Sequence, residues 1–90
     1  MRGGHAHLEM EQVLIALSGS FDVRIFDGIN WKTYSLRLPF QGLYIPPKKW
    51  RDITNFSSGS VCLSIVSTEF SELDYIRDIG EYQIYINQTL

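Results

Sequence analysis

Apolar and polar residues alternate along most of the chain, with the period of two that half-buried β-strands show. The clearest case is residues 20–26, where Phe21, Val23 and Ile25 alternate with polar side chains. Residues 13–17 are apolar at every position, which predicts a strand buried on both faces. The pattern predicts six strands, over residues 11–18, 20–26, 31–38, 43–45, 49–56 and 61–68.

Turn-forming residues separate these strands. Asp27-Gly28 stands between two alternating runs, which predicts a β-hairpin. Pro46 and Pro47 lack backbone N–H donors, so a regular ladder should not continue through them. Short strands with closely spaced turns predict one domain over residues 1–90, an all-β sandwich or barrel of antiparallel strands.

The period changes near the C-terminal end. The segment that begins at Ser71 resembles a helix capping box, so we expect a helical turn that includes Leu73 and Arg77 and ends at Gly80. Residues 81–86 fit a second helical turn, with a terminal strand as the alternative. The sequence therefore predicts a short helical segment at this end of the domain.

A sheet with an open edge needs cover, because unpaired backbone groups attract other strands. Six strands are few for a closed sandwich, and a further extended stretch starts at Met1. We therefore expect the chain to pair with a second copy as a homodimer, or to lack a natural amino-terminal part.

Composition narrows the class of protein. Hydrophobic residues make up 44% of the chain and charged residues 20%, so a packed core is expected. The net charge is −2 and the basic cluster at Lys48, Lys49 and Arg51 is short, so we expect no nucleic-acid partner. The longest apolar run is too short for a membrane span. Cys62 has no cysteine to pair with and fits a small buried group in a cytoplasmic protein.

His5 and His7 are the most informative residues. If the segment is extended, their side chains point to the same side, because side chains alternate along a strand. Imidazole exchanges protons near neutral pH and also binds metals. The pair therefore predicts either acid–base chemistry or a metal site.

Several spacings resemble the motifs of the cupin superfamily. His5, His7 and Glu11, followed by a glycine after a hydrophobic strand, match the first cupin motif, and Asn55 matches the asparagine of the second. In metal-binding cupins a histidine stands four residues before that asparagine, and here the position holds Arg51. Because arginine offers no lone pair to a metal, the resemblance favours acid–base chemistry over a metal centre.

A closer resemblance covers nearly the whole chain. The matching blocks are Arg2-Gly3-Gly4-His5-Ala6-His7, Glu11-Gln12-Val13-Leu14, Gly42-Leu43-Tyr44 followed by Pro47 and Trp50, Asn55-Phe56-Ser57-Ser58, and Asp74-Tyr75-Ile76-Arg77-Asp78. Together they are similar to the WxcM-like family of sugar-nucleotide cupins, whose nearest members are dTDP-4-oxo-6-deoxyglucose 3,4-ketoisomerases. The resemblance implies a cupin-type small jelly-roll barrel.

Two features depart from that family. Its members carry an amino-terminal segment that supplies strands exchanged between subunits and part of the nucleotide site, and this sequence lacks it. The histidine that often follows the family's tryptophan is Arg51 here.

The resemblance also implies a reaction. A ketone moves from C4 to C3 of a dTDP-4-keto-6-deoxyhexose through an enediol, in the biosynthesis of deoxysugars and surface polysaccharides such as lipopolysaccharide. His5 and His7 would be the catalytic acid–base pair, and no metal or other cofactor would be needed. The candidate substrate-binding residues are Arg2 and Arg51 for the diphosphate, Glu11 to orient an imidazole, and Tyr44 and Trp50 in the sugar or base pocket. The structural alternatives are ordinary surface charges for the arginines, a strand end for Glu11 and core aromatics for Tyr44 and Trp50.

Two alternatives stay open. One is a cupin that binds a sugar nucleotide without turning it over. The other is a metal-dependent cupin, such as a dioxygenase, with the metal at His5, His7 and Glu11.

Overall fold

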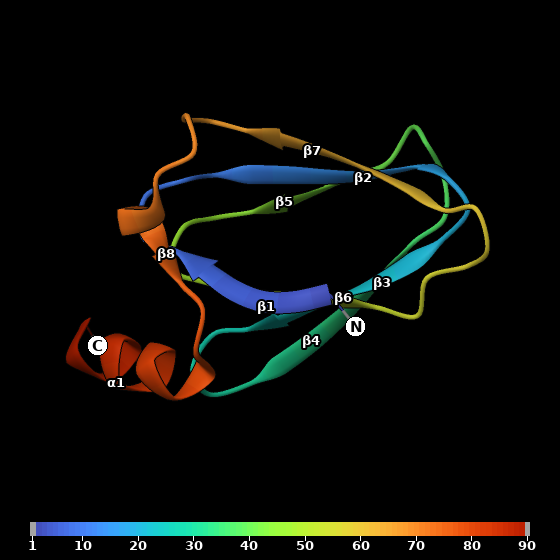
Figure 1. The fold of residues 1–90 in the computed structure, drawn as a ribbon. Coiled ribbons are helices and arrows are strands. Elements are labelled where there is room, and N and C mark those ends of the chain that lie inside the picture. The colour runs from blue at the N-terminus through green and yellow to red at the C-terminus, as the bar shows by residue number, and fades with distance from the viewer. Residues whose placement is uncertain (1, 90) are drawn as a thin grey trace.

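The structure, a computed structural model, describes residues 2–89 as two antiparallel sheets that face each other, with one helix at their end (Figure 1). One sheet has five strands in the order β4-β3-β6-β1-β8, and the other has three in the order β5-β2-β7. The strands are β1 (Arg2–His7), β2 (Gln12–Ser18), β3 (Phe21–Phe26), β4 (Trp31–Leu36), β5 (Gly42–Ile45), β6 (Trp50–Thr54), β7 (Val61–Val66) and β8 (Tyr75–Ile76).

The six predicted strands are all present, as β2 to β7, and each differs from its predicted range by a few residues at most. The hairpin at Asp27-Gly28 joins β3 to β4. Its backbone has the positive φ of 101° at Gly28 that favours glycine, and the Asp27 carboxylate accepts N–H bonds from Ile29 and Asn30. Local turn chemistry therefore fixes this register.

The segment after residue 70 differs from the prediction. Instead of a helical turn through Arg77, the chain forms a short 3-10 helix over Glu72–Asp74 and then β8. Gly80 ends no helix, because it lies inside the α-helix α1 (Ile79–Thr89). The physical reason is that the Asp74 carboxylate accepts backbone N–H bonds from the loop after β1, while its own segment pairs with β1.

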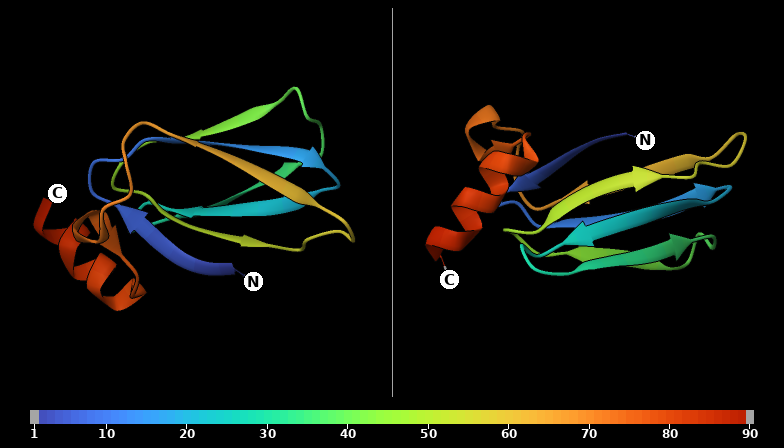
Figure 2. Two further views of the ribbon diagram at one scale, coloured as in Figure 1. Left: turned by 45° about the horizontal axis from the view of Figure 1, so that its top comes forward. Right: turned by 90° about the horizontal axis from the view of Figure 1, so that it is seen from below.

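The helix predicted over residues 81–86 is confirmed as part of α1. Asp78 caps it, since its carboxylate accepts the N–H of Glu81. Figure 2 shows α1 at one end of the sheets, beside β1 and β8. Tyr82 secures the helix there, because its hydroxyl donates to the carbonyl oxygens of Phe26 and Lys48.

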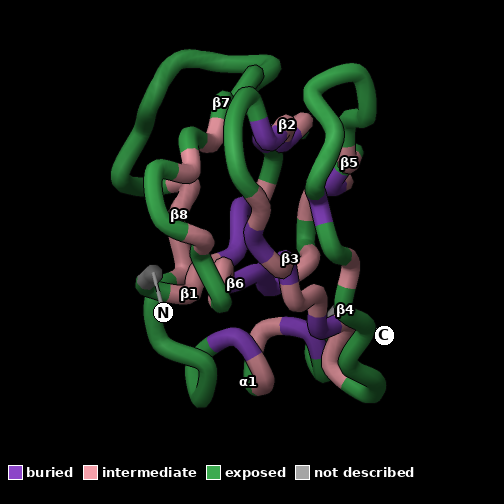
Figure 3. The backbone as a smooth tube through the Cα atoms, turned by 90° about the vertical axis from the view of Figure 1, so that its right-hand side faces the viewer, coloured by how far each residue is buried: buried purple, intermediate pink, exposed green. Residues whose placement is uncertain are grey.

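The core has two parts (Figure 3). Between the sheets lies a cluster formed by Leu14, Ala16, Phe21, Val23, Leu36 and Ile45, with Cys62 partly buried against it. Beneath α1 lies a second cluster formed by Ala6, Phe26, Trp50, Tyr82 and Ile86. The histidine-bearing strand β1 therefore packs beneath α1 through Ala6.

The predicted antiparallel architecture with a helical C-terminal end is confirmed, but the sheets are not closed into a barrel. Among residues 2–89, no backbone ladder joins the two sheets, and β8 extends β1 only at Ala6 and His7.

The expectation that residues 13–17 are buried on both faces is wrong, since Leu17 is 48% exposed on the outside of β2. Within the same residues, the structure contains no helix long and apolar enough to cross a membrane.

Candidate active site

His5 and His7 lie side by side on one face of β1, as the sequence predicts for an extended strand. Their ring centroids are 4.8 Å apart and the ring planes meet at 87°. Ala6, between them, points to the opposite face and belongs to the core beneath α1. The strand therefore holds two imidazoles in edge-to-face contact at the side of the five-stranded sheet that faces the other sheet.

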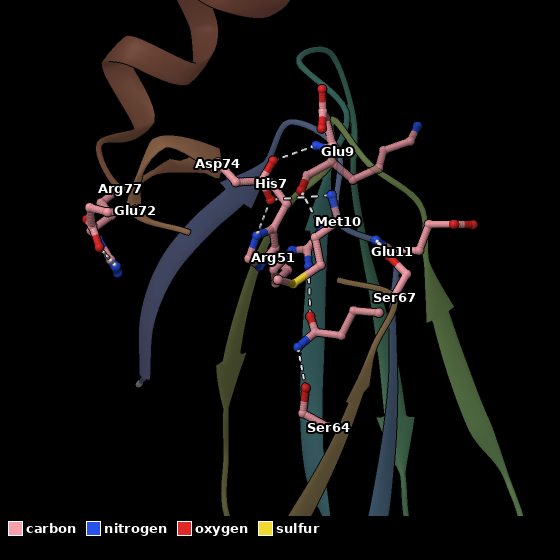
Figure 4. Close-up of polar contacts among 12 residues, drawn as sticks. His7, Glu9, Met10, Glu11, Arg51, Ser64, Ser67, Glu72, Asp74 and Arg77 are labelled. Carbon is pink, nitrogen blue, oxygen red and sulfur yellow. Dashed lines mark hydrogen bonds and ion pairs between the residues drawn. The ribbon is translucent and has the colours of Figure 1, made fainter. Parts of the chain in front are cut away.

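Asp74 fixes the orientation of His7. The Nδ1 atom of His7 lies 3.1 Å from the Oδ2 atom of Asp74, and the His7 side chain is only 1% exposed (Figure 4). Because an ionised carboxylate can only accept, Nδ1 carries the proton and Nε2 keeps a free lone pair. The same carboxylate accepts the N–H groups of Glu9 and Met10, so it also holds the loop that follows β1.

The ring of Tyr75 contacts both imidazoles. Its ring centroid is 4.3 Å from that of His7 and 5.2 Å from that of His5. The Arg77 guanidinium lies over the outside of the same ring, 4.3 Å from its centroid. The 3-10 helix thus supplies a polar partner for the histidines through Asp74, and β8 supplies an aromatic one through Tyr75.

Arg51 stands next to the histidines, because it pairs with His5 in the register of β1 and β6. Its side chain is 1% exposed, and burial lowers its pKa to about 10, which leaves it charged at neutral pH. Nη1 donates to the side-chain oxygen of Gln12 at 2.7 Å, and Nη2 donates to the Lys49 carbonyl at 3.0 Å. In the described part of the chain, this cation forms no ion pair with a carboxylate, and its Nε is buried without a partner.

The site keeps both imidazoles neutral. Burial lowers the pKa of His5 from near 6.5 to about 4, and the neighbouring Arg51 charge adds to this effect. Burial and Arg51 also lower the pKa of His7, although the hydrogen bond to Asp74 opposes them. A neutral imidazole can accept a proton, so both rings are in the state that a general base requires.

The other residues predicted for the site are placed elsewhere. The Tyr44 hydroxyl donates to the Glu11 carboxylate at 2.6 Å, and both side chains are exposed. Figure 4 shows Glu11 directed away from His7 and Arg51. Trp50 lies in the core under α1, on the face of β6 opposite Arg51. The side chain of Arg2 lies outside the described residues.

This arrangement bears on the metal-dependent alternative. A metal at His5, His7 and Glu11 needs the three side chains to converge on one point. Glu11 is bound to Tyr44 instead, and within residues 2–89 no three histidine, cysteine or acidic side chains are grouped as metal ligands. The groups beside the histidines are therefore Asp74, Tyr75 and the Arg51 guanidinium. This combination suits proton transfer.

A pocket of about 600 Å³ lies close to this cluster. Its wall includes Gln12, which contacts Arg51, together with Ile53, Cys62 and Ser64. The pocket lies between the two sheets, since these residues come from β2, β6 and β7. The pocket thus reaches Gln12, the residue that binds Arg51, while Arg51, His5 and His7 are not among the residues that line it.

Asp74, Tyr75 and Gln12 were not predicted as site residues. Asp74 and Tyr75 lie in one block of the family resemblance and Gln12 in another, so the signal was present. The helix-capping interpretation of Asp74 concealed it, because a capping carboxylate and a carboxylate bound to an imidazole look alike in sequence.

Two facing antiparallel sheets with a histidine pair on an inner strand define a cupin-like arrangement. The model of the family described as FdtA, "WxcM-like, C-terminal", matches residues 1–87, and the chain belongs to this family.

Characterised relatives are similar over most of this chain. The TDP-4-oxo-6-deoxy-alpha-D-glucose-3,4-oxoisomerase of Aneurinibacillus thermoaerophilus is 40% identical over 85 residues, which are 94% of this chain and 61% of that protein. A 3,4-ketoisomerase from Helicobacter canadensis is 43% identical, with a TM-score of 0.93 over 96% of this chain and 65% of that one. The chain thus spans a little over three-fifths of the length of these relatives.

A third relative was solved with a sugar nucleotide. It is a mutant of the 3,4-ketoisomerase QdtA from Thermoanaerobacterium thermosaccharolyticum in complex with TDP-4-keto-6-deoxyglucose. It is 37% identical to this chain, with a TM-score of 0.93 over 97% of this chain and 63% of that one. The predicted cupin-type fold class is therefore confirmed by experimental structures of the same family.

Proposed function

We propose that this chain carries the catalytic site of a sugar-nucleotide 3,4-ketoisomerase that acts on a dTDP-4-keto-6-deoxyhexose. The observation that carries the proposal is the contact between the neutral imidazoles of His5 and His7, whose ring centroids are 4.8 Å apart, beside the buried Arg51. The names of the relatives support the same reaction class.

The chemistry requires two proton movements on neighbouring carbons. The hydrogen on C3 is acidic because C3 is next to the C4 carbonyl. A neutral imidazole removes this proton as the C3–H electron pair forms the C3–C4 double bond, and the C4 carbonyl oxygen takes up a proton to give the enediol. The C3 hydroxyl then loses its proton to become the new carbonyl as a proton is delivered to C4, so two protons leave the sugar and two return. His5 and His7 are the groups we assign to these transfers.

The neighbouring residues support these steps. Asp74 stabilises the imidazolium that His7 would form after accepting a proton, and it holds Nε2 free. Arg51 would stabilise negative charge on the substrate oxygens, because a charge at close range is strongly felt in a buried site. Since C3 is oxidised as C4 is reduced in one molecule, the reaction consumes no external oxidant or reductant.

Among the predicted substrate contacts, Arg51 is the one that lies beside the histidines. Arg51 remains the proposed diphosphate or oxyanion contact because it is buried and charged beside the histidines. Arg2 stays a prediction from the sequence. We do not assign Trp50, Tyr44 or Glu11 to the sugar pocket, because Trp50 is core and the other two are bound to each other away from the histidines.

The predicted homodimer and cytoplasmic location belong to the same proposal. Its support is the outward face of the three-stranded sheet, which carries exposed apolar side chains. These residues are Leu17, Tyr44, Val61, Leu63 and Ile65. Light scattering with size exclusion would report a mass of two chains if the pairing is correct, and a mass of one chain if it is not.

The function is tested by proton NMR of dTDP-4-keto-6-deoxyglucose mixed with the chain. We expect signals of the 3-keto isomer to grow in, and His5→Asn or His7→Asn to abolish the growth. Binding of the sugar nucleotide without any new signals would instead favour the second interpretation, a cupin that binds without turnover.

A further inference from the structure

Arg51 is a buried cation that forms no ion pair with any carboxylate of residues 2–89. An isolated buried charge is strongly destabilising, so proteins usually pair it or place it where a ligand brings the opposite charge. The acceptors on Arg51 are neutral, namely the Gln12 side chain and the Lys49 carbonyl. Asp74 is close enough to raise the pKa of Arg51, but its carboxylate is bound to His7 and to backbone N–H groups.

Gln12 has a fixed orientation in this cluster. Its Oε1 accepts from Arg51 at 2.7 Å, and its Nε2 donates to the Ser64 hydroxyl at 2.6 Å. Only one orientation of the amide fits, because guanidinium has no acceptor atoms. Figure 4 draws the two contacts as dashed lines that lead from Arg51 to Ser64. Two strands of the three-stranded sheet thus hold the guanidinium of the other sheet.

We propose that Gln12 is a positioning residue that fixes the Arg51 guanidinium beside the histidines and, because it is neutral, leaves the charge free for an anionic oxygen of the ligand. The proposal rests on the proposed function for the identity of that ligand. The anionic oxygen belongs either to the diphosphate of the sugar nucleotide or to the enediolate formed during the reaction. Gln12 and Ser64 line the pocket of about 600 Å³, so an anion in this pocket would lie beside the Gln12 side chain that binds Arg51.

A purely structural role predicts different behaviour. If Gln12 only ties the two sheets together, a glutamate in its place would tie them at least as well, since it would form an ion pair with Arg51. If Gln12 serves to keep the cation available, the same glutamate would neutralise it and impair function while the fold is preserved. Gln12→Glu therefore separates stability from function.

The test compares Gln12→Glu with Gln41→Glu, which adds the same charge in the exposed loop after β4. We would measure the Kd for TDP by calorimetry, kcat for the keto sugar nucleotide by NMR, and the pKa of His5 by NMR without ligand. We expect Gln12→Glu to keep the melting temperature of the parent or exceed it. We also expect about tenfold or greater loss in TDP affinity or in kcat, as lost charge-assisted contacts of this kind produce.

The two sources of the anion give different results. Weaker TDP binding would identify the diphosphate, and a lower kcat at unchanged Kd would identify the enediolate. The pKa of His5 should rise in Gln12→Glu, because the new carboxylate offsets the Arg51 charge that holds it down. Gln41→Glu should change none of the three quantities.

The proposal is overturned if Gln12→Glu leaves the Kd, kcat and the pKa of His5 at parent values. It is also overturned if all function is lost together with the fold, as judged by the melting temperature. If the parent chain binds TDP but has no turnover, the proposed function fails on its own, and the Kd and the pKa of His5 still decide the role of Gln12.

Discussion

The Nδ1 atom of His7 lies 3.1 Å from the Oδ2 atom of Asp74, although 67 residues separate the two in sequence. The contact joins the end of β1 to the 3-10 helix just before β8 and gives the imidazole one defined tautomer. Because Asp74 also binds two backbone N–H groups after β1, one carboxylate sets both the ring and the loop beside it. The proposed proton transfers depend on this orientation of His7 by Asp74.

Replacing Asp74 with asparagine should impair catalysis more than folding. The amide can still accept from His7, but it carries no charge to stabilise an imidazolium, so the pKa of His7 should fall further. General acid–base assistance is commonly worth about 10²–10⁴-fold, and we expect a loss of about tenfold or more in kcat/KM. Asp78→Asn is a matched control, because asparagine caps helices nearly as well as aspartate. A D74N variant whose kcat/KM is within twofold of the parent would refute the role of the contact.

The acid limb of the pH profile should lie below that of ordinary histidine. Burial and Arg51 lower the pKa of His5 to about 4 and also lower that of His7, so both rings stay neutral below the usual 6.5. A plot of kcat/KM against pH reports the free enzyme, and its acid limb should fall below pH 6.5. An acid limb above pH 6.5 would contradict the neutral pair.

The same shift affects stability, with a sign that follows from proton uptake. The unfolded chain binds a proton on His5 below pH 6.5, whereas the folded chain resists doing so until about pH 4. The free energy of unfolding should therefore decrease as the pH falls through this range. Urea titrations at pH 7 and pH 5 measure the decrease, which should be smaller in His5→Asn. An equal decrease in that variant would show that other groups cause it.

Removing the Arg51 charge should raise the pKa of His5. Arg51→Met keeps a long apolar stem but takes away the cation, which is the second-largest cause of the lowered pKa. NMR titration of His5 would show a pKa nearer to 6.5, although burial should keep it below that value. An unchanged His5 pKa would mean that the Arg51 charge does not reach the imidazole.

Tyr82→Phe tests how α1 is secured to the sheet. The hydroxyl is buried and donates to the carbonyl oxygens of Phe26 and Lys48, at 3.2 Å and 2.7 Å. Its loss leaves buried acceptors unpaired, so we expect a cost of about 1–3 kcal/mol in the free energy of unfolding. Tyr85→Phe, on the same helix, is the control, because the hydroxyl of Tyr85 makes no hydrogen bond with the described residues. Equal stability of the two variants would contradict the tether.

Local periodicity was enough to predict the strands and the histidine pair. Alternation places side chains on faces wherever a strand has one buried side, so His5 and His7 had to point the same way once β1 was extended. The same reasoning failed for β2, because the sequence does not say whether a second layer covers its outer face, where Leu17 is exposed.

The roles of several site residues depend on which strands pair, and local periodicity does not determine that pairing. A carboxylate such as Asp74 can cap a helix or orient an imidazole, and only the pairing of β8 with β1 selects the second role. Likewise the sequence placed Trp50 and Arg51 together as candidate pocket residues. Their alternation on β6 sends the indole into the core beneath α1 and only the guanidinium to the histidines.

The most direct test of the central claim is exchange of the C3 hydrogen of dTDP-4-keto-6-deoxyglucose with deuterated water, followed by NMR. The account predicts that the parent chain exchanges this hydrogen. It also predicts that His5→Asn and His7→Asn reduce the exchange rate by about 10²-fold or more while TDP still binds. Exchange at the parental rate in both variants would contradict the assignment of the two imidazoles as the groups that move the protons.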